Sequence, residues 1–183
     1  MPRWVLEAAV ERAAGSGDAF PEVVFFGGEP LLEGAHLRRA VTLLRERSRP
    51  GLRPRLRLVT NGTLLDAETI RFLRSEGIAV DLSSDGVREA QELRAPGTFD
   101  DLDRLLRRVS AGGFEAMGSP PRIRMTLTGA NARHLSASVA YFRSFGVTEV
   151  HASPALGPSP DWTNSAAREL DRQLSRVVRL CAA

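Results

Sequence analysis

The sequence contains very little cysteine, no lysine and no long apolar stretch, and each absence excludes a class of function. Its one cysteine, Cys181, cannot form an internal disulfide, a zinc site or an iron–sulfur site without further ligands. No apolar run approaches the roughly 18 residues of a membrane span, and the N-terminus lacks the apolar segment of a secretory signal. We therefore expect a cytoplasmic protein with no membrane contact and no metal site.

All 25 basic residues are arginine, yet the formal net charge is only +3. The arginines are distributed along the chain and many have acids close by, as Arg104 and Arg107 have Asp101 and Asp103. Aromatic residues make up only 6% of the chain, and a nucleic-acid surface needs clustered basic residues with aromatic residues among them. The charges therefore predict solvated helix faces and no nucleic-acid partner.

The 183 residues are enough for one domain with a real core. Short apolar runs alternate with segments of helical periodicity, which predicts β/α units and a parallel sheet. We expect strands over 23–26, 56–59, 78–82, 122–127 and 147–152. We expect helices over about 3–14, 34–47, 67–76, 102–109, 132–145 and 164–181.

Local signals refine this pattern. Helix N-caps are predicted at Asp66, at Thr98 in a capping box with Asp101, and at Asn131. The polar stretch 87–97 predicts a loop with some helix. A closed eight-stranded barrel needs about 250 residues, so we expect an α/β fold that forms a partial (β/α) barrel of about five or six parallel strands. A flat doubly wound sheet is the alternative.

Small polar clusters follow the expected strands, at Gly27–Pro30, Thr60–Gly62 and Ser83–Gly86. Ligands bind at the carboxyl ends of parallel strands, and glycine lets a ligand approach the backbone closely. Hydrogen bonds to a polar ligand could come from Glu29, Asn61, Ser83 and Asp85. An ordinary turn explains any one cluster, but three in succession predict a small-molecule site, without identifying the ligand.

Several segments resemble the core of radical S-adenosylmethionine (SAM) enzymes, in order and at similar spacing. The segment Val-Val-Phe-Phe-Gly-Gly-Glu-Pro-Leu-Leu at 23–32 is similar to the family's second-strand segment, and Leu-Val-Thr-Asn-Gly-Thr-Leu-Leu at 58–65 to its third. Leu-Ser-Ser-Asp-Gly at 82–86 resembles the fourth-strand segment. The stretches at 91–94, 97–100 and 124–128 are similar to the subgroup with C-terminal SPASM domains, which includes anaerobic sulfatase maturases and peptide maturases. The resemblance covers about residues 3–153.

The resemblance implies which residues bind the cofactor. The amino end of SAM would be held by Gly27, Gly28, Glu29 and Pro30. Ser83, Asp85 and Arg94 would lie near the carboxylate or ribose of SAM, and Asn61 would line the cavity floor. A complete homologue would cleave SAM with a 4Fe–4S cluster and abstract hydrogen from a peptide or other substrate. No residue of this chain is assigned a catalytic role.

The sequence departs from the family in one respect: it has no CxxxCxxC segment for the cluster. We therefore expect the chain alone to bind no 4Fe–4S cluster and not to be catalytic by itself. A truncation, a misplaced start and a degenerate paralogue would all give this sequence. The alternatives are a non-catalytic barrel that binds a peptide or partner, and an unrelated flavodoxin-like or sugar-binding domain.

The resemblance also implies the domain organisation. Residues 1–161 would form the partial core, and residues 162–183 would form a C-terminal helix or linker toward an absent C-terminal domain. The two edges of such a partial sheet would be exposed. Exposed strand edges favour association, so we expect the chain to associate through them.

Overall fold

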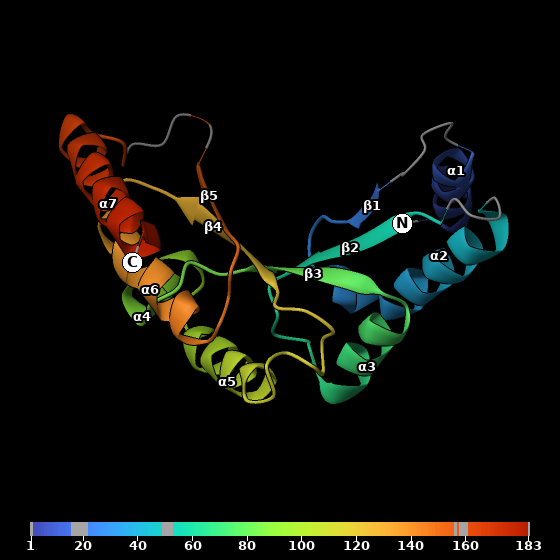
Figure 1. Ribbon diagram of the computed structural model, residues 1–183. Coiled ribbons are helices and arrows are strands. Elements are labelled where there is room, and N and C mark those ends of the chain that lie inside the picture. Colours follow the sequence, from blue (N-terminus) through green and yellow to red (C-terminus); the bar gives the residue numbers. More distant parts are fainter. Residues whose placement is uncertain (1, 16–21, 49–52, 156, 158–160, 183) are drawn as a thin grey trace. The chain divides into compact units, whose positions relative to one another are not determined.

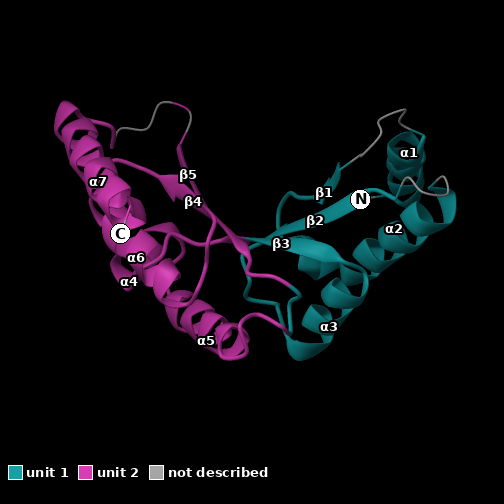
Figure 2. Ribbon diagram, viewed as in Figure 1, with its two compact units in different colours: residues 1–81, 116–118 teal, residues 82–115, 119–183 magenta. Residues whose placement is uncertain are grey.

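A computed structural model describes residues 2–15, 22–48, 53–155, 157 and 161–182. The chain forms two compact units, residues 1–81 with 116–118 and residues 82–115 with 119–183 (Figure 2). Among the described residues, no helix combines the length and the apolar composition needed to cross a membrane.

The first unit alternates helices and strands (Figure 1). Its elements are α1 (Arg3–Ala14), β1 (Glu22–Phe25), the 3-10 helix η1 (Pro30–Glu33), α2 (Gly34–Arg47), β2 (Arg55–Thr60), α3 (Ala67–Ser75) and β3 (Ile78–Ser83), whose last residues enter the second unit. Strands β1 and β2 are parallel, with Val23 opposite Leu56. In β2, Leu56 and Leu58 are buried, whereas the first residue, Arg55, is exposed. Strand β1 is less buried than its apolar sequence predicts, because Val24 is 43% exposed and Val23 and Phe25 are only half-buried.

Helix α3 shows how a local signal fixes an element. The Asp66 carboxylate accepts a hydrogen bond of 2.7 Å from the Thr69 backbone N–H, which confirms the predicted N-cap. That backbone hydrogen bond lowers the pKa of Asp66 below its usual range. Gly77 follows the helix with φ +65°, a conformation that glycine adopts readily.

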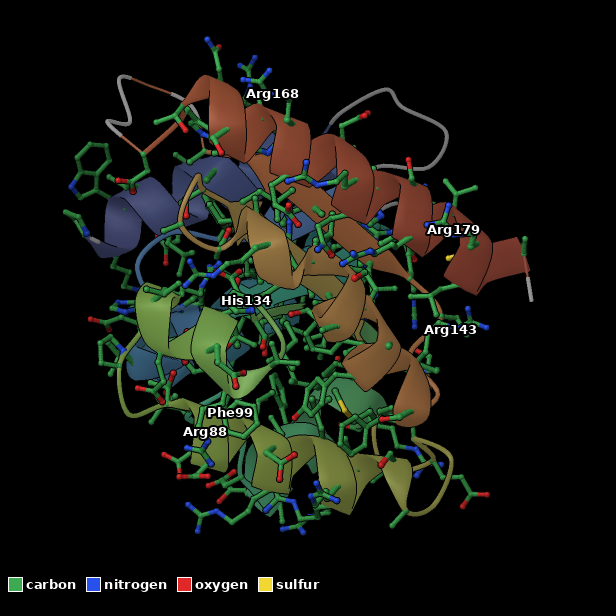
Figure 3. The ribbon with its side chains drawn as sticks, turned by 90° about the vertical axis from the view of Figure 1, so that its left-hand side faces the viewer. Arg88, Phe99, His134, Arg143, Arg168 and Arg179 are labelled. Atoms are coloured by element: carbon green, nitrogen blue, oxygen red, sulfur yellow. The ribbon has the colours of Figure 1, made fainter. Side chains whose placement is uncertain are left out.

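The second unit continues the alternation. Its elements are α4 (Arg88–Arg94), α5 (Phe99–Ser110), β4 (Arg122–Leu127), the 3-10 helix η2 (Ala132–His134), α6 (Leu135–Ser144), β5 (Val150–Pro154) and α7 (Asn164–Ala182). Strands β4 and β5 are parallel, with Ile123 opposite Val150. Its core contains the fully buried side chains of Leu106, Ile123, Leu135 and Phe142. Arg143, Arg168 and Arg179 point outward from α6 and α7 (Figure 3) and are exposed, as expected of solvated helix faces.

The strand order in the sheet is β1-β2-β3-β4-β5, the same as the order along the chain. A parallel strand placed next to its predecessor needs a crossover connection, and the intervening helices supply these crossovers. The predicted α/β class with five parallel strands is confirmed.

Residues 87–97 were predicted to be a loop with some helix, and residues 88–94 of this stretch form helix α4, on which Ala90 and Gln91 are buried. Two other details differ from the prediction. The last strand begins at Val150 instead of 147, because Val147 is buried in the core and its N–H bonds to the Phe142 carbonyl. The predicted capping box at Thr98 does not form, because the Thr98 hydroxyl donates to the Ala95 carbonyl at 2.7 Å instead.

Candidate functional site

The turn after β1 contains two consecutive glycines that leave its backbone open. Gly27 and Gly28 have φ of +107° and +54°, and both are exposed. A Cβ atom added at either position would meet no heavy atom of the described chain within 4 Å. Within the part of the chain that the structure describes, their backbone N–H and C=O groups make no hydrogen bond. The turn can therefore offer backbone donors and acceptors to a ligand at close range.

The carboxylate of Glu29 holds this turn in place through hydrogen bonds. One oxygen of its carboxylate accepts from the Leu31 N–H at 3.1 Å and from the Thr60 hydroxyl at 2.8 Å. The other oxygen accepts from the Asn61 N–H at 2.8 Å. Glu29 thus joins the turn after β1 to the turn after β2, and its carboxylate is engaged with protein groups.

Asn61 and Pro30 complete the group in the first unit. The Asn61 side chain is exposed, and its oxygen accepts from the Thr63 N–H at 3.0 Å and the Thr63 hydroxyl at 2.8 Å. Pro30 begins η1, where its missing N–H leaves no unpaired donor. The five predicted site residues of this unit therefore lie on two neighbouring turns that Glu29 connects.

The loop after β3, Ser83–Gly86 with the following Val87, differs in that its N–H groups are already bonded. The Ser84 N–H donates to the Arg124 carbonyl at 3.2 Å. The N–H groups of Asp85, Gly86 and Val87 donate to the side chains of Gln91, Ser84 and Ser138, at 2.9, 3.3 and 3.2 Å. Gly86 has φ +94°, and a Cβ atom there would lie 2.3 Å from the Cβ of Ser138. Other residues of the second unit therefore occupy the backbone N–H groups of this loop and the space beside Gly86. We call it the closed loop.

The side chain of Asp85 is also buried, and both of its carboxylate oxygens accept hydrogen bonds from the same unit. Its Oδ1 accepts from the Thr126 N–H at 3.0 Å and from Nη1 of Arg94 at 2.9 Å. Its Oδ2 accepts from Nδ2 of Asn131 at 3.0 Å. The Asp85 side chain is 2% exposed and that of Arg94 is 28% exposed. Of the three residues predicted in this unit, the structure brings Asp85 and Arg94 into contact, whereas Ser83 is half-buried at the end of β3.

Sequence reasoning missed two residues that hold this loop. Gln91 is 1% exposed; it accepts from Asp85 N–H and donates to the Thr98 hydroxyl. Asn131 was predicted to cap a helix, which is wrong, because its amide instead donates to Asp85 and to the Thr126 carbonyl at 2.8 Å. The signal for Gln91 was its position three residues before Arg94, which is close to one helical turn, in a stretch that was predicted to be a loop with some helix.

The described residues do not fit an iron–sulfur cluster. Cys181 is exposed at the end of α7, and the described residues contain no group of three or more His, Cys, Asp or Glu side chains that could hold a metal ion. A 4Fe–4S cluster needs at least three thiolates from the protein here. We therefore assign no step to a cluster on this chain.

Comparisons with known proteins give the family. A family model described as the radical SAM superfamily matches residues 3–127. The chain is 31% identical over 145 residues to the cysteine-type anaerobic sulfatase-maturating enzyme of Clostridium perfringens strain 13, covering 76% of this chain and 38% of that enzyme.

Solved structures give the fold. The chain matches native anSMEcpe with bound AdoMet and Kp18Cys peptide at a TM-score of 0.79 and 25% identity, over 95% of this chain and 51% of that one. It matches native anSMEcpe with bound AdoMet at a TM-score of 0.79 and 24% identity, over 98% of this chain. These matches confirm the radical SAM-like partial barrel. This chain spans 51% of the length of the first of those structures and 38% of the length of its curated relative. Because the family model matches more than half of the chain, the protein belongs to the radical SAM superfamily.

Proposed function

We propose that this chain is the SAM-binding part of a radical SAM peptide or protein maturase, and that its Gly27–Pro30 turn holds the amino end of SAM. The observation that carries the proposal is the pair of exposed glycines whose backbone groups no described residue engages. The ammonium group of SAM is a hydrogen-bond donor, so the carbonyl groups of the turn are its natural acceptors. Glu29 would keep the turn in place while its own carboxylate stays engaged.

The relatives support the nature of the ligand and substrate. The matched anSMEcpe structures contain AdoMet, and one contains a peptide. Bound SAM would supply the radical chemistry in a complete enzyme, and this chain would supply binding and orientation. We further propose a peptide or protein substrate for the whole protein, a boundary after residue 161, and a cytoplasmic location. Asn61, Ser83 and Arg94 remain predicted ligand neighbours.

Calorimetric titration of SAM into the native chain tests this proposal. Hydrogen bonds contribute about 0.5–1.5 kcal/mol each, and association must offset several kcal/mol of lost freedom. We therefore expect a Kd of about 1 mM, equivalent to about −4 kcal/mol. Gly28→Val should abolish binding, because a branched side chain would occupy the space that the ligand needs.

Gly77→Val is the matched control for this titration, because Gly77 also has positive φ and open space around it but lies after α3. Both substitutions introduce similar backbone strain, so only Gly28→Val should affect SAM. Binding at low micromolar SAM that Gly28→Val leaves unchanged would contradict the proposed site.

A second candidate function is a binding module that takes an extended segment of another polypeptide along β1. Strand β1 is the first strand of the sheet and pairs with β2 alone among the described strands. A cavity of about 460 Å³ beside it is lined mostly by apolar side chains of α1, β1 and α2, including Leu6, Val10 and Phe25. Phe26 at its border is 77% exposed. An unpaired backbone edge beside an apolar cavity suits an added strand.

Sedimentation velocity tests this candidate through self-association. We expect the native chain to associate at tens of micromolar and Phe26→Glu to remain monomeric, because the charge would enter the apolar contact. Val178→Glu is the control, since Val178 on α7 is also largely exposed, at 67%. A monomeric native chain, or equal dissociation by both variants, would reject the β1 surface.

A further inference from the structure

Helix α7 leaves much of its apolar side in solvent. The helix runs from Asn164 to Ala182, a length of about 28 Å, and its one buried residue is polar: Gln173, which is 3% exposed. Leu174 and Val178 are 47% and 67% exposed. A helix that served only to cover its own unit would bury these aliphatic side chains.

The contacts of Gln173 explain why the aliphatic residues face outward. Its side-chain oxygen accepts hydrogen bonds from the Ser136 N–H at 3.1 Å and from the Ser136 hydroxyl at 2.5 Å, and its amide donates to Glu169 at 2.8 Å. The bonds to Ser136 fix the rotation of α7 on α6. A rotation that buried Leu174 or Val178 would break these bonds and leave polar groups unpaired. The exposure of the aliphatic side is therefore set by the way α7 is held.

Small and aliphatic residues continue this exposed side along the helix. Ala167, Leu174, Val178 and Cys181 are all exposed. They recur at intervals of seven, four and three residues, which places them on one side of a helix over about 21 Å. We call these four residues the α7 stripe. Its spacing and length are those of a seam along which a second helix packs.

The positive charge of the protein is concentrated on the same part of the second unit. Together η2, α6 and α7 contain six arginines and two acids, a formal net charge of +4, whereas the rest of the chain contains 19 arginines and 20 acids, a formal net charge of −1. Arg172 pairs with Glu169, but Arg168, Arg176 and Arg179 make no ion pair with another described residue. Arg168 and Arg179 project outward from α7 (Figure 3). A positive surface of this kind attracts an acidic partner.

We propose that the outer side of α7 is a docking surface for an acidic amphipathic helix of another protein. The apolar side chains of that helix cover the α7 stripe, and its carboxylates pair with Arg168 and Arg179. The proposal goes beyond the proposed function and does not depend on SAM. Every residue that it uses belongs to the second unit.

Two other classes of partner fit this surface less well. A helix that lies in a membrane interface uses a broad apolar face with aromatic residues. Helix α7 has no aromatic residue, and Leu170 and Val177, on the same side of the helix as Gln173, are already half-buried. Nucleic acids are bound through basic residues with aromatic residues that stack on bases, and an aliphatic stripe offers them nothing. The combination of arginine with exposed aliphatic residues favours a protein.

Fluorescence anisotropy of a labelled synthetic peptide tests the proposal on the full chain. The peptide repeats Leu-Glu-Ala-Leu-Leu-Glu-Gln three times, which gives an acidic amphipathic helix about as long as α7. We expect a Kd of about 10 μM in dilute buffer. Binding should weaken about tenfold in roughly 0.5 M salt, because salt screens exposed charges. A peptide with lysine in place of glutamate should not bind.

Two changes on α7 should weaken binding of the acidic peptide. Arg168→Gln combined with Arg179→Gln should raise the Kd about tenfold, the combined effect of two exposed ion pairs. Val178→Ser should raise it by about the same factor, because the variant removes one aliphatic contact from the α7 stripe.

Matched changes elsewhere control for net charge and for apolar surface. Arg39→Gln combined with Arg74→Gln removes the same charge from exposed positions of α2 and α3. Leu93→Ser removes an aliphatic side chain from α4, where Leu93 is 52% exposed. Neither control should change the Kd by more than about twofold. Circular dichroism should show the same melting temperature for all these variants, because the substituted residues are exposed.

Three results would overturn the inference. The first is failure of the acidic peptide to bind at about 1 mM chain. The second is equal weakening by the α7 variants and their controls, since the peptide would then respond to charge or apolar surface in general. The third comes from phosphatidylserine vesicles and a DNA duplex, titrated with the same variants. If either binds the native chain more tightly than the peptide does, and Arg168→Gln with Arg179→Gln removes that binding, the surface serves a membrane or a nucleic acid instead.

Discussion

The turn at Gly27–Pro30 and the loop at Ser83–Gly86 follow parallel strands and look alike in sequence, but they are built in opposite ways. The turn leaves the backbone of two glycines exposed and is held by the Glu29 side chain from one side. The loop directs its N–H groups to Gln91, Ser84 and Ser138 and packs its glycine against α6. In both places the missing glycine side chain leaves space beside the backbone. In the turn that space is empty and a ligand can enter it, whereas in the loop Ser138 of α6 fills it.

The largest expected effect concerns the closed loop. Gly86→Ala would place a Cβ atom 2.3 Å from the Cβ of Ser138, at φ +94°. Overpacking and backbone strain together should lower the free energy of unfolding by about 3 kcal/mol. Urea denaturation followed by circular dichroism measures this. Gly97→Ala, at φ +78° with open space, should lose only about 1 kcal/mol, and equal losses would mean that Ser138 does not close the loop.

Hydrogen exchange compares the two regions without mutation. The amides of Asp85, Gly86 and Val87 are bonded to side chains of their own unit, whereas those of Gly27 and Gly28 are exposed. We expect the loop amides to exchange at least about a hundredfold more slowly, because exchange there requires local opening. Similar rates in both segments would remove the distinction between an open turn and a closed loop.

The sequence predicted the strand ends but not which turn would be open. Alternating apolar runs fix strands such as 122–127 and place Gly27, Asn61 and Asp85 after successive strands. The partners of a polar side chain depend on contacts that are distant in sequence, as between Asp85 and Asn131, which are 46 residues apart. For the same reason Thr98 and Asn131, both good N-cap residues, bond elsewhere, and the contacts of Gln91 with Asp85 and Thr98 were not predicted.

A smaller effect is expected at the support of the open turn. Glu29→Gln leaves one acceptor oxygen where two oxygens now receive three hydrogen bonds. Unfolding free energy should fall by about 1.5 kcal/mol, the value of one hydrogen bond to a charged group. The control is Glu33→Gln, because the Glu33 side chain is 66% exposed and its ion pair among the described residues is with His36 alone, so its loss should be under about 0.5 kcal/mol. A Glu29→Gln variant as stable as Glu33→Gln would show that Glu29 does not hold the turn.

The most direct test of the central claim is a titration of the ¹⁵N-labelled native chain with SAM, followed through the glycine amide resonances. We predict progressive shifts of the Gly27 and Gly28 amide resonances as SAM reaches millimolar concentration, because the ligand meets their open backbone. The Gly77 and Gly97 amides, which also have positive φ and open space, should not move. Shifts elsewhere with Gly27 and Gly28 unmoved would contradict the assignment of the SAM site to this turn.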